Sequence, residues 1–206
     1  MRSMNDDPRL YVPAAARNRL PIYKVLRSHL PDRGLILEIA SGSGEHVIFF
    51  AERSAPDLIF QPSDLNLDAR GSIDAWARQL QLPNVRPAIA VDAASAVWPI
   101  DNADAVLCIN MIHIAPWEAT LGLMAGAARI LPPEGMLYLY GPYCRDGRHT
   151  APSNATFDRD LRNRDPAWGV RNLETVASVA EAHGFAPPIV EDMPANNLSV
   201  IFRRKP

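Results

Sequence analysis

The sequence predicts an α/β protein in which seven strands form a mostly parallel sheet with helices on both faces, the last two strands forming an antiparallel pair. Three observations predict this fold class. Apolar runs of strand length alternate with segments of helical periodicity, which is typical of α/β proteins. Four successive apolar runs end in a polar residue, and the first leads directly into a glycine turn. Parallel sheets of this Rossmann-like kind bind ligands at the carboxyl ends of their strands.

The first half of the chain is expected to supply two strands and the helices around them. Proline and helix-capping residues mark several of the boundaries. In order, the expected elements are a helix pair over Ala14 to Leu30 in an N-terminal helical segment 1–30, broken or restarted at Pro21, a strand starting at Leu35, a helix over roughly Glu45 to Glu52, a strand from Leu58 that ends in Asp64, and a helix capped by Ser72 with Ile73, Trp76 and Leu80 on one face.

The second half of the chain is expected to complete one domain that spans 1–206. Its elements are, in order, a strand over Ala88 to Val91 ending in Asp92, a strand over Asp104 to Ile109 ending in Asn110, a helix from Pro116 to about Leu131, a strand over Met136 to Tyr140, a helix between Asn172 and Gly184, and paired strands over Ile189 to Asp192 and Leu198 to Arg203. The polar stretch 141–171 shows little periodicity. We expect it to be either a roof over a substrate or a solvated insertion with one short helix near Ser153 to Asn163.

Composition indicates a globular domain without a polynucleotide-binding surface. The chain has 206 residues, 48% of them hydrophobic and 21% charged, which is ordinary for a soluble domain. Its net charge of -2 and pI near 6.2 give no basic footprint, so a small-molecule partner is favoured over nucleic acid. The sequence contains neither a long apolar window nor a signal-peptide pattern, so we expect no membrane partner and a cytoplasmic location. Oligomeric state is not indicated.

Metal and disulfide chemistry are not expected. The five histidines are scattered without the spacing of metal ligands, so no metal site is predicted. The two cysteines, Cys108 and Cys144, lack CxxC spacing, and free thiols are expected.

The glycine turn after the first strand favours a nucleotide-like ligand. Gly42 and Gly44 can adopt positive φ, and the helix that follows offers unpaired N–H groups. A dinucleotide fingerprint would place a third glycine where this chain has Val47, which disfavours a nicotinamide oxidoreductase. Asp64, twenty positions after Gly44, can accept hydrogen bonds from both ribose hydroxyls. Glu38 lies inside the strand, where a charge requires a donor.

At these residues the chain resembles the class I S-adenosylmethionine-dependent methyltransferases and, more closely, the DUF938 or methyltransferase-like 26 group. The motifs that carry the resemblance span nearly the whole chain: Ala15-Ala16-Arg17-Asn18, Glu38-Ile39-Ala40-Ser41-Gly42-Ser43-Gly44, Gln61-Pro62-Ser63-Asp64, Cys108-Ile109-Asn110-Met111-Ile112-His113, Tyr140-Gly141-Pro142-Tyr143 and Met193-Pro194-Ala195-Asn196-Asn197. The resemblance implies S-adenosylmethionine as the cofactor, the ribose on Asp64, the adenine amine on Asp92 and the methionine end at the glycine turn. The cofactor-binding residues expected are Arg17, Asn18, Glu38, Ala40, Ser41, Gly42, Gly44, Asp64, Leu65, Asp92, Ala93 and Asn110.

The methyl acceptor is expected to be a small molecule approached by His113 or Tyr143. Methyl transfer mainly requires alignment, and a general base is needed only for some acceptors. His113 has the residue type to take a proton, although a histidine that merely lines the pocket would leave the same sequence signal. A second class stays open, a non-catalytic module that binds the cofactor or a protein partner, because fold alone does not establish catalysis.

Overall fold

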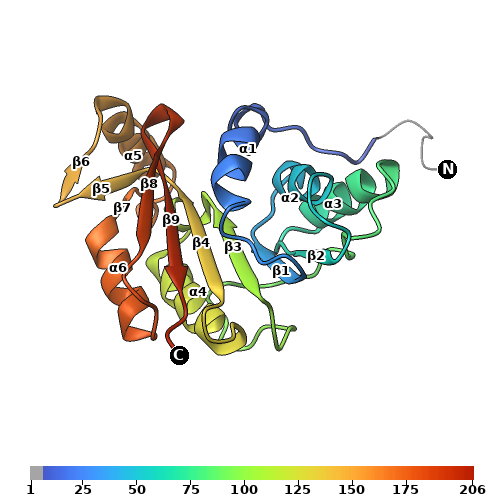
Figure 1. Ribbon diagram of the computed structural model, residues 1–206. Coiled ribbons are helices and arrows are strands. Elements are labelled where there is room, and N and C mark those ends of the chain that lie inside the picture. Colours follow the sequence, from blue (N-terminus) through green and yellow to red (C-terminus); the bar gives the residue numbers. More distant parts are fainter. Residues whose placement is uncertain (1–6) are drawn as a thin grey trace.

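A six-stranded sheet organises the chain, with strand order β2-β1-β3-β4-β9-β8. The computed structural model describes residues 7–206 (Figure 1). The elements of the sheet are β1 (Gly34–Ile39), β2 (Leu58–Pro62), β3 (Ala105–Ile109), β4 (Met136–Gly141), β8 (Ile189–Met193) and β9 (Asn197–Arg203). The helices are α1 (Pro13–Leu26), α2 (Glu45–Ala51), α3 (Leu67–Gln79), α4 (Trp117–Ile130), α5 (Pro152–Arg164) and α6 (Leu173–Ala182), with short 3-10 turns η1 (Met111–His113) and η2 (Pro194–Asn196).

Parallel pairing places the carboxyl ends of four strands at one edge. β1 lies between β2 and β3, β3 pairs with β4, and all three pairings are parallel. β9 runs antiparallel to both β4 and β8, as expected for the last two strands. Every residue of β3 and β4 is buried, because helices cover both faces of the sheet.

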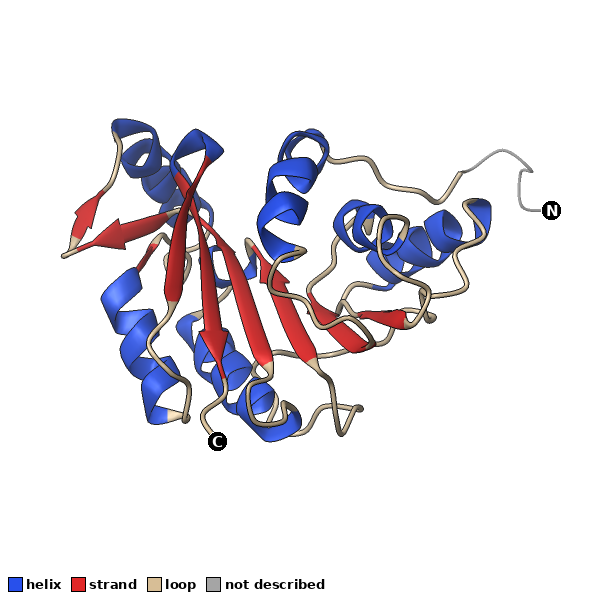
Figure 2. Ribbon diagram, viewed as in Figure 1, coloured by secondary structure: helices blue, strands red, loops and turns tan. Residues whose placement is uncertain are grey.

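Two apolar cores separate these helices into layers. Leu37 of β1 faces the core formed with α4 and α6, whereas its neighbour Ile36 faces the core formed with α1, α2 and α3. This alternation follows from the period of two in a strand. Figure 2 shows the helices on both sides of the strands. The predicted α/β class with a mostly parallel sheet is therefore confirmed.

The expected strand over Ala88 to Val91 is not part of the sheet, so the sheet has six strands instead of the seven predicted. This segment runs beside β2 and forms only isolated parallel bridges, Phe60 with Val85 and Ser63 with Ile89. The two bridges are three residues apart on the β2 side and four residues apart on the other side, so the register shifts by one residue between them. The ladder is therefore interrupted at this edge.

Two helices, α1 and α3, differ from the prediction. α1 is one continuous helix with Pro21 inside it, not a broken pair. α3 begins earlier than expected, because the side chain of Asn66 accepts hydrogen bonds from the N–H groups of Asp68 and Ala69, and Ser72 lies within the helix. Asparagine competes with serine for the N-cap, and sequence alone did not rank them. α6 begins after its N-cap residue Asn172 as predicted, although the Asn172 side chain makes no capping hydrogen bond.

The stretch 141–171 is folded. It contains α5 and the strands β5 (Tyr143–Arg145) and β6 (Arg148–His149), which join β7 (Arg171–Asn172) in a three-stranded sheet of order β6-β5-β7. The short helix expected near Ser153 to Asn163 corresponds to α5. Figure 1 shows this small sheet and α5 at the end of the molecule away from α2 and α3.

Candidate functional site

The turn between β1 and α2 is built from residues with positive φ. Ala40, Gly42 and Gly44 have φ of 55°, 56° and 88°. A side chain at Gly42 would meet nothing within 4 Å, whereas a Cβ at Gly44 would lie 2.8 Å from Ile73 of α3. Gly44 therefore allows close packing of the turn on α3, and the backbone at Gly42 faces open space that a ligand can occupy.

A cavity of about 550 Å³ lies at the carboxyl ends of the parallel strands. This volume is in the range of small-molecule and cofactor sites. Its lining includes five of the predicted residues, Ala40, Asp64, Leu65, Asp92 and Ala93. The rest of its lining was not predicted: Ile39, Val91, Ala94, Met111, Ala115, Pro116, Glu118 and Ala119. Most of these follow β3 in the chain, and only their position after a strand end could have indicated them.

Asp64 is held in place by the glycine turn. Its Oδ2 accepts a hydrogen bond of 2.9 Å from the Gly42 N–H, and its Oδ1 accepts one of 2.8 Å from the Asn66 N–H. Arg70 donates to the backbone carbonyl of Asp64 over 2.7 Å. Because a carboxylate has about four acceptor positions, this anchored group retains acceptor capacity toward the cavity.

Glu38 is a buried carboxyl group without a full set of partners. Only 1% of the residue is exposed, and among residues 7–206 its Oε2 atom has no hydrogen-bond partner. Burial raises the pKa of Glu38 to about 8; a hydrogen bond with Ser41 opposes this shift and the charge of Asp64 adds to it. At neutral pH the group is mostly protonated, and a cationic ligand beside it would favour the charged form.

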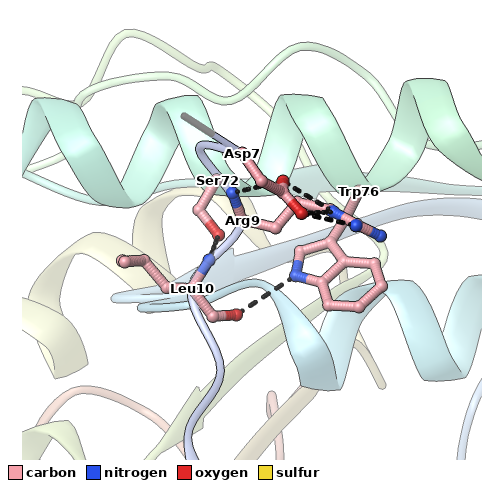
Figure 3. A network of polar contacts seen from close by, with 5 residues as sticks. All are labelled: Asp7, Arg9, Leu10, Ser72 and Trp76. Atoms are coloured by element: carbon pink, nitrogen blue, oxygen red, sulfur yellow. Dashed lines mark hydrogen bonds and ion pairs between the residues drawn. The ribbon is translucent and has the colours of Figure 1, made fainter. Parts of the chain in front are cut away.

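The N-terminal segment is tied to the glycine turn, a connection that the sequence did not predict. Ser72 Oγ accepts a hydrogen bond from the Leu10 N–H over 2.8 Å and donates one to the Ser43 carbonyl over 2.7 Å. Trp76 donates to the Leu10 carbonyl, and Arg9 lies over the Trp76 ring, 4.6 Å from its centroid (Figure 3). The chain that leads into α1 is therefore fixed against α3 and the turn together.

The structure places the other predicted cofactor residues near the strand ends but outside the cavity lining. Ser41 follows β1 and is buried, and Asn110 follows β3 with φ of 62°. Asn18, on α1, accepts a hydrogen bond of 2.7 Å from the His46 ring. Arg17 lies on the exposed side of α1. The cofactor-binding roles of Arg17 and Asn18 stay a prediction.

His113 and Tyr143 form a buried pair. Their rings meet edge to face with centroids 5.3 Å apart, and neither the His113 nitrogens nor the Tyr143 hydroxyl has a hydrogen-bond partner within residues 7–206. Burial, and then the charge of Arg171, lowers the pKa of His113 to about 3. A Cβ at Gly141 would lie 2.3 Å from His113 Nε2. The ring is therefore neutral and fills space that only glycine leaves free; it does not line the cavity.

Comparison with known proteins identifies the family. The model of the family described as a protein of unknown function, DUF938, matches residues 9–204. The chain belongs to the DUF938 family. Because this match covers nearly the whole chain, the family predicted from the motifs is confirmed.

Solved structures with the same fold include methyltransferases. An O-methyltransferase family protein from Burkholderia thailandensis superposes with a TM-score of 0.78 at 21% identity, over 93% of this chain and 57% of its own. Human N-acetylserotonin methyltransferase, solved in complex with SAM, gives a TM-score of 0.75 at 11% identity, over 94% and 53%. The YcgJ protein from Bacillus subtilis gives 0.70 at 14%, over 93% and 99%. The chain thus spans little more than half the length of the first two proteins.

The described part of the chain, residues 7–206, contains neither a candidate metal centre nor a helix that could span a membrane. Within residues 7–206 no group of three or more histidine, cysteine or acidic side chains is arranged to hold a metal ion. None of the helices in that part of the chain is long and apolar enough to cross a membrane.

Proposed function

We propose that this DUF938 chain is an S-adenosylmethionine-dependent methyltransferase that acts on a small-molecule acceptor. The observation that carries the proposal is the cavity at the strand ends, with Asp64 anchored to the Gly42 N–H at its wall. The fold similarity to methyltransferases, including one solved with SAM, supports the same proposal.

The residues present fit this cofactor. The anchored Asp64 has free acceptor capacity for ribose hydroxyls, and the lining next to Asp92 and Ala93 is largely apolar, as an adenine ring requires. Glu38 has an orphaned carboxyl oxygen behind the glycine turn, which suits the ammonium group at the methionine end. Bound there, the cofactor would supply an electrophilic methyl group on a sulfonium.

The protein's contribution in this proposal is alignment and shielding. The turn at Gly42 would let a ligand lie against the backbone, and α1 would bring Arg17 and Asn18 to the methionine end. His113 and Tyr143, the residues expected to approach the acceptor, pack on each other outside the cavity lining. Because His113 is buried, lies outside the cavity lining and has a pKa of about 3, no proton transfer is assigned to it in this proposal.

Cofactor binding is the first test. Isothermal titration with S-adenosylmethionine and S-adenosylhomocysteine should show binding, and Asp64→Ala should weaken it by at least about tenfold, as expected for loss of a charged hydrogen-bond acceptor. Asp101→Ala is the matched control, because this exposed acid lies outside the cavity. Absence of binding to the unmodified protein would contradict the proposal.

A second function is favoured by one observation. Since the candidate base is buried, neutral and outside the cavity lining, the fold could serve as a non-catalytic module that binds the cofactor or a protein partner. Transfer of labelled methyl groups across a metabolite panel separates the two functions. Turnover that Asp64→Ala abolishes supports the enzyme, whereas cofactor binding without turnover on any acceptor supports the module.

A further inference from the structure

The stretch 141–171 contains a cysteine and a histidine that a tight hairpin places opposite each other. Asp146 and Gly147 have φ of 50° and 71°, and two successive residues with positive φ form the type I′ turn that joins neighbouring antiparallel strands. The register of β5 and β6 then pairs Cys144 with His149. Their side chains project to the same face, as directly opposed residues of an antiparallel pair do.

The two side chains are in hydrogen-bonding contact. Cys144 Sγ lies 3.3 Å from His149 Nδ1. On the other side of the ring, His149 Nε2 lies 3.5 Å from Asp158 Oδ2 on α5. Because a carboxylate can only accept, the tautomer that Asp158 favours is the one with the proton on Nε2, and that tautomer leaves Nδ1 free to accept from the thiol.

Asp158 is fixed independently of the histidine. Its Oδ1 accepts a hydrogen bond of 2.7 Å from the Val170 N–H, and its Oδ2 accepts one of 3.1 Å from Arg162. The Cys144 thiol thus contacts the His149 imidazole, which in turn contacts the anchored Asp158 carboxylate. This is the arrangement in which a base contacts a nucleophile and a third group orients the base.

We propose that Cys144 is a nucleophilic thiol with His149 as its base and Asp158 as a positioning residue, and that it reacts with low-molecular-weight disulfides. This site lies outside the 550 Å³ cavity and does not depend on methyl transfer. Burial raises the pKa of Cys144, with the charge of Asp158 adding to the shift and Arg162 opposing it. The group is therefore a thiol at neutral pH, and its reactivity requires a base in contact.

The reaction balances with the disulfide as oxidant. His149 Nδ1 takes the thiol proton, and the Cys144 sulfur attacks one sulfur of the disulfide. The S–S bond breaks, a new S–S bond forms at Cys144, and the departing thiolate receives the proton from the imidazolium. The products are a mixed disulfide on the protein and one free small thiol.

The test uses the full chain, with Cys108 as an internal standard. Cys108 is 2% exposed and burial raises its pKa to about 12. At neutral pH, iodoacetamide and, separately, oxidised glutathione should modify Cys144 at least about tenfold faster than Cys108, as mapped by peptide mass spectrometry. Equal rates at the two cysteines would overturn the proposal.

Variants separate a chemical role from a structural one. His149→Asn should slow modification of Cys144 by about tenfold or more, the lower end of what a general base supplies. Asp158→Asn should slow it in the same direction, while His183→Asn, at the end of α6, should leave it unchanged. A merely structural hairpin would loosen in these variants and expose the thiol, which would speed labelling. Unchanged or faster labelling in His149→Asn therefore contradicts the proposal.

Discussion

Replacement of Glu38 by glutamine should stabilise the free protein at neutral pH. The carboxyl is 1% exposed and has a pKa of about 8 against an ordinary value of 4.5. Because the folded state holds the proton more tightly than the unfolded state, stability is greatest below pH 4.5 and declines as pH rises toward 8. Above that value the loss is complete.

The size of this change in stability follows from the shift in the pKa of Glu38. Each pKa unit corresponds to about 1.4 kcal/mol, so this one group costs the folded state about 3 kcal/mol between pH 5 and pH 8. Glutamine resembles the protonated acid in shape and does not titrate. The difference in free energy of unfolding between Glu38→Gln and the unmodified protein should therefore grow by about 3 kcal/mol over this range, in favour of the variant.

Urea unfolding at several pH values measures this difference, and subtraction removes the titration of all groups the two proteins share. A difference that stays constant from pH 5 to pH 8 would refute the assignment of a buried, protonated Glu38. Under the proposed function the same variant should bind S-adenosylmethionine more weakly, since an amide does not neutralise an ammonium group.

Three further perturbations test the geometry of the site. Gly44→Ala should lower the free energy of unfolding by more than about 2 kcal/mol, because strain at positive φ adds to a contact with Ile73, whereas Gly42→Ala should cost about 1 kcal/mol; urea unfolding of the pair compares them, and equal losses would contradict the packing. His113→Phe should remove a loss of stability as pH falls from 6.5 toward 3, since the folded state resists protonation of this ring; thermal unfolding at both ends of the range measures it, and an unchanged acid profile would argue against a buried neutral imidazole. Ser72→Ala should cost about 1 to 2 kcal/mol and expose the N-terminal segment to limited proteolysis, and protection equal to that of the unmodified protein would contradict its anchoring.

Local chemistry made much of the fold predictable. Some features can be predicted from a few adjacent residues, and the structure has them as expected. They are the strand before the glycine turn, the end of α6 at Gly184 and the antiparallel pair of strands at the end of the chain. The strand predicted around Ala88 was wrong because a strand also requires an unbroken ladder with its neighbour, and here the register shifts by one residue between two isolated bridges. The apolar pattern of this segment does not indicate whether it pairs with β2 along its whole length.

The candidate site was predictable only where one chain segment builds it. Asp64 and Asp92 each end an apolar run and both line the cavity. Contacts between distant segments were not predictable, because they depend on how helices dock. The hydrogen bonds of Ser72 to Leu10 and Ser43 join three such segments. Likewise, the burial of His113 results from packing against Gly141, a neighbour that its own segment does not specify.

Several buried polar atoms near the strand ends have no hydrogen-bond partner among the described residues. Within residues 7–206, the buried side chains with unpartnered nitrogen or oxygen atoms are Glu38, Trp98, His113, Thr120 and Tyr143. Three of these five lie within or just after β1, β3 and β4. Each such atom costs about 1 to 3 kcal/mol when it is left without a partner, so a fold selected for stability alone would replace them. Glu38 lies two residues before Ala40, which lines the cavity, and a ligand bound at this strand end would supply the missing partner of its carboxyl group. On this reasoning the Glu38→Gln variant should gain stability as a free protein and lose affinity for the cofactor at the same time.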